Sequence, residues 1–254
     1  VYDVGGAFGG PIRQDKLWFF FASRFWGSEN YAAGNYFNKL QGVYIGKPGS
    51  GVTRYEQDLS RQAYTNGYLR DIANLRITYK ATEKSKFNFS QNFQKHCDCF
   101  RGVDGLLAPE AVAQRLYGPT GVGQVTWTYP ASNKLLFEGA MSMQLMPWWN
   151  RPQPGVSDTT TAVQELSTNT YYRAPLGLQD YWTNNFYYRF ASSYVTGSHS
   201  FKAGAYLSQA WNKIETRVHN DMTYALRNGV PAQITMWTTP FTAKSVVDGD
   251  LGIF

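Results

Sequence analysis

Long apolar runs are missing from this chain of 254 residues. The longest, Leu17–Ala22, is far shorter than the roughly 20 residues that a membrane-spanning helix needs. The mean hydropathy, −0.41, is that of a polar chain. Together these features exclude a helical membrane protein.

Charged residues are also scarce, at 17% of the chain against a usual quarter. The 24 Lys and Arg exceed the 18 Asp and Glu, and a net charge of +6 raises the idea of nucleic-acid binding. However, no basic run reaches about five residues, the length typical of a nucleic-acid patch. We assign these cations to turns, loops and an enclosed polar interior, and expect no nucleic-acid partner.

Cysteine is nearly absent. Cys97 and Cys99 are the only two, and they stand in the segment His96-Cys97-Asp98-Cys99. The favoured interpretation is a disulfide or loop staple in an oxidising compartment. Unpaired thiols and a metal site with His96 and Asp98 are the alternatives, although the C-x₂-C spacing of zinc sites is missing.

Catalytic motifs are missing as well. His96, His199 and His219 lie far apart in the sequence, and no nucleophile elbow accompanies them. A catalytic triad needs a nucleophile and an orienting carboxylate within reach of one histidine. We therefore expect no catalytic residue and no enzyme activity.

Two further segments resemble ligand motifs only superficially. Asp98 and Asp104 could help to hold calcium, but the EF-hand pattern is absent. The glycine-rich segment Gly46–Gly51 has Pro48 after Lys47, so the Gly-Lys-Ser/Thr ending of a phosphate loop is missing. The sequence predicts a flexible loop there, and no metal or cofactor.

Aromatic residues, in contrast, are abundant. The chain has 18 Tyr, 16 Phe and 8 Trp, which make up 17% of its residues, together with 24 Gly. Tyr and Trp suit membrane interfaces, where one end of the ring is dry and the other is wet. This composition is typical of a barrel wall around a wet lumen.

Apolar and polar residues alternate with period two in paired runs of about ten residues. In the clearest run, Leu75, Ile77 and Tyr79 alternate with polar neighbours that include Arg76. Period two is the strand period, because successive side chains point to opposite faces. Similar alternation occurs around Phe87–Phe93, Val125–Tyr129, Leu135–Leu145, Trp182–Tyr194 and Phe201–Trp211.

The links between these runs alternate in length. Short links separate the members of a pair, and links of about 25 to 40 residues rich in Gly, Pro, Tyr and Trp separate the pairs. The short links are Gly10–Asp15, Ala81–Ser85, Pro130–Asn133 and Thr196–His199. We therefore predict an all-β fold of about eight to ten strands: an antiparallel, up-and-down transmembrane β-barrel segment, an incomplete barrel with long extracellular loops.

One hairpin is expected inside a long loop. Met222–Trp237 has its turn at Asn228-Gly229, a dipeptide that accepts the positive φ of a type I′ turn. Pro231 just after the turn fits an edge strand, because proline donates no ladder hydrogen bond.

Two aromatic pairs stand in the long loops: Trp148 with Trp149, and Tyr171 with Tyr172. In one interpretation they form an exposed rim that grips a ligand, since flat rings stack on sugars or apolar solutes. In the other, which we favour for the two tryptophans, Trp148 and Trp149 belong to the outer aromatic girdle of the barrel.

The segment Gly9–Phe20, GGPIRQDKLWFF, resembles the stretch that opens the barrel of Oar-like TonB-dependent receptors. These outer-membrane proteins often begin with a carboxypeptidase-regulatory-like domain. Further matches are Lys84–Phe89, Cys97–Cys99 followed by Pro109–Ala111, Gly197–Gly204, Arg227–Pro231 and Asp250–Phe254.

The resemblance implies active import of an unidentified solute across the bacterial outer membrane, driven by the TonB complex. Residues 1–254 would be one region, the N-terminal part of the barrel, with the plug, the TonB box and the C-terminal strands outside it. Val1 is not a start methionine and Asp250–Phe254 stops inside an alternating run, which fits a piece of a longer protein. The partners would be outer-membrane lipid, the protein's own plug domain, the TonB complex and the solute.

Charged residues on the polar side of the strands are candidates for the lumen. Arg76, Glu138 and Arg189 are expected to line the path or to hydrogen-bond to the plug. Two other classes remain open: a passive porin with the same wall, and a soluble all-β module for carbohydrate binding or adhesion, or a sugar-active enzyme.

Overall fold

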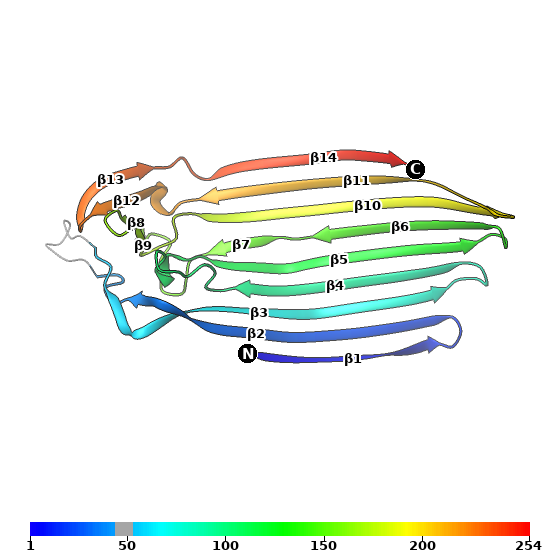
Figure 1. Ribbon diagram of the computed structural model, residues 1–254, viewed down its shortest axis with the longest axis horizontal. Helices are drawn as coiled ribbons and strands as arrows, with labels where there is room; N and C mark the ends of the chain where they lie inside the picture. Colours follow the sequence, from blue (N-terminus) through cyan, green and yellow to red (C-terminus); the bar gives the residue numbers. More distant parts are fainter. Residues whose placement is uncertain (44–52) are drawn as a thin grey trace.

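The computed structural model describes residues 1–43 and 53–254, and these form mainly β-strands. Ten strands make one sheet in which every pair is antiparallel (Figure 1). The all-β antiparallel prediction is confirmed. The strands are β1 (Tyr2–Arg13), β2 (Leu17–Asn38), β3 (Gln57–Lys80), β4 (Lys86–Asp98), β5 (Gln114–Pro130), β6 (Leu135–Leu145), β7 (Trp148–Arg151), β10 (Leu178–Thr196), β11 (His199–Arg217) and β14 (Phe241–Ile253).

Neighbours in the sheet follow the chain, in the order β1-β2-β3-β4-β5-β6-β10-β11-β14. The short strand β7 continues the line of β6 between β5 and β10. β1 and β14 are the two edges, so the sheet is open (Figure 1). Among the described residues, no helix is long and apolar enough to cross a membrane.

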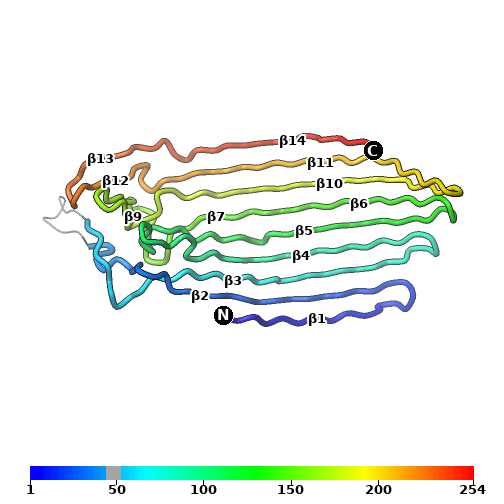
Figure 2. Tube along the Cα trace, in the orientation of Figure 1, coloured from blue at the N-terminus to red at the C-terminus, as the bar shows by residue number. Residues whose placement is uncertain are grey.

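The short and long links lie at opposite ends of the sheet, as predicted (Figure 2). Residues 14–16, 81–85, 131–134 and 197–198 connect strands at what we call the turn end. The described residues 39–43 and 53–56, together with 99–113, 152–177 and 218–240, lie at the loop end. Such segregation is typical of an up-and-down barrel wall, whose strands alternate in direction.

Several strands are longer than the sequence predicted. β2 has 22 residues and β3 has 24, and both continue far into what the sequence assigned to a long link. At about 3.4 Å per residue, β3 spans roughly 80 Å, well over the ~30 Å of a bilayer core. The alternation fades there while backbone pairing continues, for example between Tyr31 and Tyr64. β14 likewise begins at Phe241, before the expected Asp250.

One face of the sheet is apolar. The strand register carries a single row of side chains across eight strands, from β2 to β14, with all members on the same face. We call this side the apolar face. The predicted alternation of apolar and polar residues along the strands is confirmed. The row consists of Phe19, Ile77, Phe89, Val125, Met141, Tyr188, Leu207 and Leu251.

The other side, the amide face, carries neutral polar groups. Thr78 Oγ1 donates to Asn88 Oδ1 at 3.1 Å, and Asn88 Nδ2 donates to Thr126 Oγ1 at 3.3 Å. Asn185 Nδ2 donates to Gln144 Oε1 at 3.2 Å. These cross-strand pairs satisfy polar groups within the face and stabilise the register.

A second, four-stranded sheet folds the loops together at the loop end (Figure 1). Its strands are β8 (Ala162–Glu165), β9 (Thr170–Tyr172), β12 (Met222–Arg227) and β13 (Val230–Met236), in the order β13-β12-β8-β9. The β8–β12 pair is parallel and the other pairs are antiparallel. The two 3₁₀ turns, η1 (Pro109–Ala111) and η2 (His219–Asp221), lie in the same region.

The hairpin expected in this loop is confirmed. β12 and β13 turn at Asn228 and Gly229, which have φ values of 51° and 75°. Both residues thus adopt the left-handed conformation of a type I′ turn. Pro231 lies on β13, an edge strand of the four-stranded sheet, as expected for a residue that donates no ladder hydrogen bond.

Buried apolar side chains collect at the loop end. One core joins Ala108, Val163, Tyr172 and Leu226 from four separate segments. Along the long strands, in contrast, large side chains on the apolar face stay open, such as Phe190 at 51% exposed. The long sheet therefore has no protein core of its own.

Two substitutions on β10 test the face assignment, because Phe190 and Tyr187 are each 51% exposed but lie on opposite faces. In lipid vesicles we expect Phe190→Arg to lower the free energy of unfolding by about 2–4 kcal/mol, the usual effect of a cation on the lipid side of a barrel. Tyr187→Arg should cost less than half as much. Denaturant titration followed by tryptophan fluorescence measures both, and equal losses would contradict the assignment.

Candidate functional site at the loop end of the sheet

Four rings form one cross-strand row near the loop end. The register aligns His96 on β4, Tyr117 on β5, Trp148 on β7 and Tyr181 on β10. His96 stacks on Tyr117 with ring centroids 3.6 Å apart, and Trp148 stacks on Tyr181 at 3.7 Å. Tyr117 and Trp148 are 6.1 Å apart, so the four rings form a continuous group that we call the aromatic ladder.

The aromatic ladder lies on the amide face. β6 and β7 keep one register against β10, in which Leu145 pairs with Asn184 and Trp148 pairs with Tyr181. Trp148 therefore has the parity of Gln144, an amide-face residue. The aromatic ladder therefore lies on the same face of the long sheet as the polar side chains nearer the turn end.

The sequence treated Trp148 and Trp149 as one cluster, but the structure separates them. As neighbours on a strand they point to opposite faces, and Trp149 pairs with Leu116 and Asp180 on the apolar face. The position of Trp149 suits an outer girdle, and that of Trp148 suits contact with a ligand on the amide face. Both roles stay predictions.

A cation accompanies the ladder. The guanidinium carbon of Arg115 lies 4.2 Å from the centroid of the Trp148 ring, a cation–π distance. Arg115 pairs in register with Asp98, so an acid stands beside it on the amide face. Arg115 Nε is buried and has no hydrogen-bond partner among the described residues. The loop end thus offers rings together with hydrogen-bond donors.

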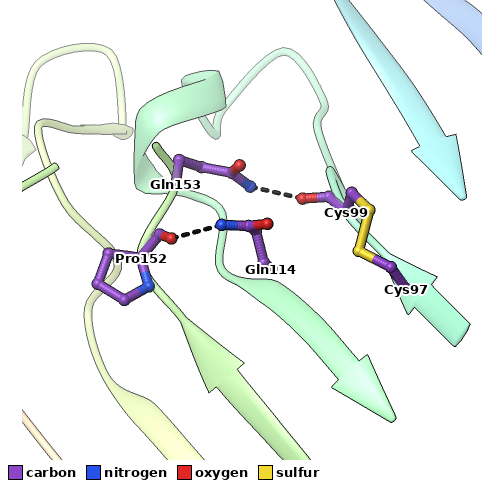
Figure 3. The surroundings of a disulfide bond; sticks show 5 residues. All are labelled: Cys97, Cys99, Gln114, Pro152 and Gln153. Carbon is purple, nitrogen blue, oxygen red and sulfur yellow. Dashed lines mark hydrogen bonds between the residues drawn. A yellow bond between two sulfur atoms is a disulfide. The ribbon is translucent and has the colours of Figure 1, made fainter. Parts of the chain in front are cut away.

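Cys97 and Cys99, directly after His96, form a disulfide with an S–S distance of 1.96 Å (Figure 3). Gln153 Nε2 donates to the carbonyl oxygen of Cys99 at 2.6 Å, and Gln114 Nε2 donates to Pro152 O at 2.7 Å. The first bond ties the segment after β4 to the segment after β7, and the second ties the start of β5 to that same segment. In this state neither sulfur is a thiolate that a metal could use.

The tyrosine pair does not form an exposed rim, which corrects the sequence interpretation. Tyr172 is 1% exposed and packs in the loop core, with its ring 6.0 Å from that of Tyr55. Its hydroxyl donates to Thr53 O at 3.3 Å, and burial raises the pKa of Tyr172 to about 12. Tyr171 is half-buried, and its N–H donates to Leu106 O at 2.8 Å.

Arg76, Glu138 and Arg189 all lie on the amide face, but the structure does not gather them into one site. Glu138 forms an ion pair with Lys202 at 2.6 Å. The Arg189 guanidinium lies 5.2 Å from the Phe254 ring centroid. Their proposed contacts with a plug or a solute stay predictions.

The remaining motif residues are spread over the molecule. His199 begins β11 at the turn end, whereas His219 lies in η2 with Nδ1 3.1 Å from Thr160 O. Asp104 accepts backbone N–H bonds from residues 106 and 107 at 2.8 and 2.9 Å. The Gly46–Gly51 segment lies outside the described residues. Within residues 1–43 and 53–254, no group of three His, Cys, Asp or Glu is placed to hold a metal.

A cavity of about 670 Å³ opens beside the four-stranded sheet. It has mixed lining, from hydroxyl groups such as Thr161 to apolar side chains such as Val163 and Ile234. Sequence reasoning missed it because its walls combine β8 with the β12–β13 hairpin, which lies far from β8 in the chain. Its size is within the range of small-molecule sites.

Glu165 fastens the β12–β13 hairpin to β8. Its carboxylate accepts the N–H groups of Asn228 and Gly229, each at 2.9 Å, and that of Ser167 at 3.0 Å. Desolvation alone would raise the pKa of Glu165, but the bonds from Ser167, Gly229 and Asn228 outweigh it and lower the pKa to about 2. Each bond favours the ionised form.

The lowered pKa makes the hairpin contact pH-dependent. The stabilisation by Glu165 is complete above its ordinary pKa and is lost as the pH falls through the folded-state value. We expect amide protection at Asn228 and Gly229, measured by hydrogen exchange, to fall between about pH 5 and pH 2. Glu165→Gln should give weaker protection that no longer varies over this range.

Glu83→Gln is the matched control, because Glu83 is a turn carboxylate at the opposite end of the sheet. It should leave the protection profile of the hairpin unchanged. An unaltered pH profile in Glu165→Gln would show that this carboxylate does not hold the turn.

Comparison with known proteins gives one structural likeness. No protein-family model matches the chain, and no curated protein matches it. The crystal structure of the outer membrane transporter YddB from Escherichia coli is similar, with a TM-score of 0.58 at 10% sequence identity. The likeness covers 99% of this chain but 31% of that one, so the chain spans about a third of its length. The fold is that of a fragment of an outer-membrane β-barrel protein.

Proposed function

We propose that this chain is part of the wall of a bacterial outer-membrane transporter that imports a solute actively, in the manner of an Oar-like TonB-dependent receptor. One observation carries the proposal: the strand pairing gives the long sheet an apolar face and an amide face, with the long loops at one end. A wall between lipid and an aqueous lumen needs this arrangement. The likeness to a transporter supports it.

In the proposed mechanism, the loop end faces the outside and captures the solute. The aromatic ladder with Arg115 offers stacking surfaces and donors on the amide face, where a solute entering the lumen passes first. Below it, Arg76, Glu138 and Arg189 contact a plug domain of the same protein. The TonB complex then remodels the plug, and the solute crosses along the amide face.

Trp148 and Trp149 provide a matched pair of variants, because these neighbours lie on opposite faces. The test uses a strain whose own copy of the gene is deleted and which carries the wild-type or variant protein. Uptake of fluorescent oligosaccharides, peptides and ferric chelates identifies the solute class. For that class, Trp148→Ala should lower the initial uptake rate roughly tenfold, because the solute would lose about one aromatic stacking contact. Trp149→Ala should stay within about twofold of wild type, since its ring is not on the capture side.

An uncoupler of the proton gradient separates active import from passive flow. Uptake that stops with the uncoupler supports dependence on TonB. Uptake that continues at the same rate would identify a passive porin instead. Equal losses in Trp148→Ala and Trp149→Ala would contradict the assignment of the ladder as the capture surface.

A further inference from the structure

The four-stranded sheet carries an apolar row that is covered at one end and open at the other. The strand register aligns Ile234 on β13, Tyr224 on β12, Val163 on β8 and Tyr172 on β9. Val163 and Tyr172 are 0% and 1% exposed, because they pack in the loop core, whereas Ile234 is 60% exposed. Among the described residues, therefore, the apolar surface at the β13 end of the row has no full cover.

The cavity of about 670 Å³ has this apolar surface as its floor. Three members of the row, Ile234, Tyr224 and Val163, line it. Leu226 has the same parity as Tyr224 and pairs with Pro231, and both of these residues line the cavity as well. The floor therefore continues the loop core. An apolar body bound there would remove this surface from water, which favours binding.

Two threonines add hydroxyl groups to the lining of the cavity. Thr53 is 8% exposed, and its Oγ1 atom is buried without a hydrogen-bond partner among the described residues. Thr161 Oγ1 accepts a hydrogen bond from Asn220 Nδ2 at 2.9 Å, so its own proton remains to be donated. A buried hydroxyl without a partner costs free energy, and a ligand oxygen that accepts its proton would recover that cost.

The charges around the cavity favour an anion. Arg173 is the one charged residue among the described residues that line it, and it is 7% exposed. A guanidinium has five N–H donors, so a partner within the protein still leaves donors for a ligand. β12 and β13 contain no acid, and the acid of β8, Glu165, is engaged by the turn at Asn228 and Gly229. A carboxylate matches such a set of donors, because it accepts hydrogen bonds and donates none.

We propose that the cavity beside the four-stranded sheet binds an amphipathic organic acid. The apolar body of the acid lies on the floor, and its carboxylate accepts hydrogen bonds from Thr53, Thr161 and Arg173. The site shares no residue with the aromatic ladder, so it is a second ligand site at the loop end. The inference goes beyond the proposed import, since it concerns binding alone and depends neither on the TonB complex nor on a plug.

The test measures binding to the intact protein in lipid nanodiscs by isothermal titration calorimetry, with empty nanodiscs to correct for uptake by the lipid. Three probes share one apolar body and differ in charge: naphthaleneacetate, the neutral naphthaleneacetamide and the cation of naphthylethylamine. The acid should bind roughly tenfold more tightly than the amide, because hydrogen bonds to a charged group are the stronger ones. The amine should bind more weakly than the amide, because the Arg173 charge repels it.

Ile234→Ala and Val230→Ala are matched variants on β13, because these residues are 60% and 63% exposed but Ile234 lines the cavity and Val230 does not. Ile234→Ala should weaken the acid and the amide alike, by roughly fivefold, through lost apolar contact. Val230→Ala should bind both as wild type does. Thr161→Val should lower the preference for the acid over the amide roughly fivefold, and Arg173→Gln should abolish it.

Equal affinities of the wild-type protein for the acid and the amide would overturn the inference, because they exclude carboxylate recognition. Equal affinities of Ile234→Ala and Val230→Ala place the probe elsewhere and overturn it too. Should Arg173→Gln fail to fold, Thr161→Val and the wild-type preference decide the matter. Binding is measured without transport: a protein that imports its solute but binds no acid contradicts this inference alone, and one that binds the acid but imports nothing contradicts only the proposed function.

Discussion

The structure depends on antiparallel strand pairing that keeps each face of the sheet continuous. It carries the side-chain row from Phe19 to Leu251 across eight strands without a change of face. Because side chains alternate with period two, a slip by one residue would move the whole apolar set to the amide face. Where the β3–β4 register shifts, between Asp71 and Ala73, one extra residue is accommodated and the parity on β4 is kept. The apolar face and the amide face stay separate only while this strand pairing is kept. Any function that uses the two faces depends on it.

The distribution of buried side chains explains why two surroundings are needed. The loop end has its own cores, built around Tyr172 and around Ala63, and resembles a small folded domain. The long sheet has none among the described residues: large side chains such as Phe190 are exposed on the apolar face, and polar side chains such as Gln124 are exposed on the amide face. In the proposed location, hydrocarbon would cover the first surface and water or a polar plug would cover the second. Glu165 holds the β12–β13 turn against β8 within this loop-end sheet.

The sequence predicted those features that local chemistry determines. The alternation of apolar and polar residues predicted the two faces of the strands near the turn end, and Asn228-Gly229 predicted a turn. Both signals come from residues that are neighbours in the chain. Contacts between distant segments gave no such signal. The aromatic ladder joins β4, β5, β7 and β10, and Asp180 on β10 contacts Arg151 on β7 and Arg217 on β11. Tyr172 was misjudged because a tyrosine in a loop does not reveal its burial. The opposite faces of Trp148 and Trp149, however, follow from period two once a strand is assigned there.

The most direct test of the two-faced wall is a scan of single cysteines along β10 from residue 185 to residue 192, each labelled with a fluorophore. Cys97 and Cys99 are bonded to each other, so the introduced thiol is the one available for labelling. In vesicles, labels at even positions should be quenched by nitroxides on lipid chains, and labels at odd positions by a water-soluble quencher. Quenching that does not alternate, or that is aqueous at every position, would contradict the account.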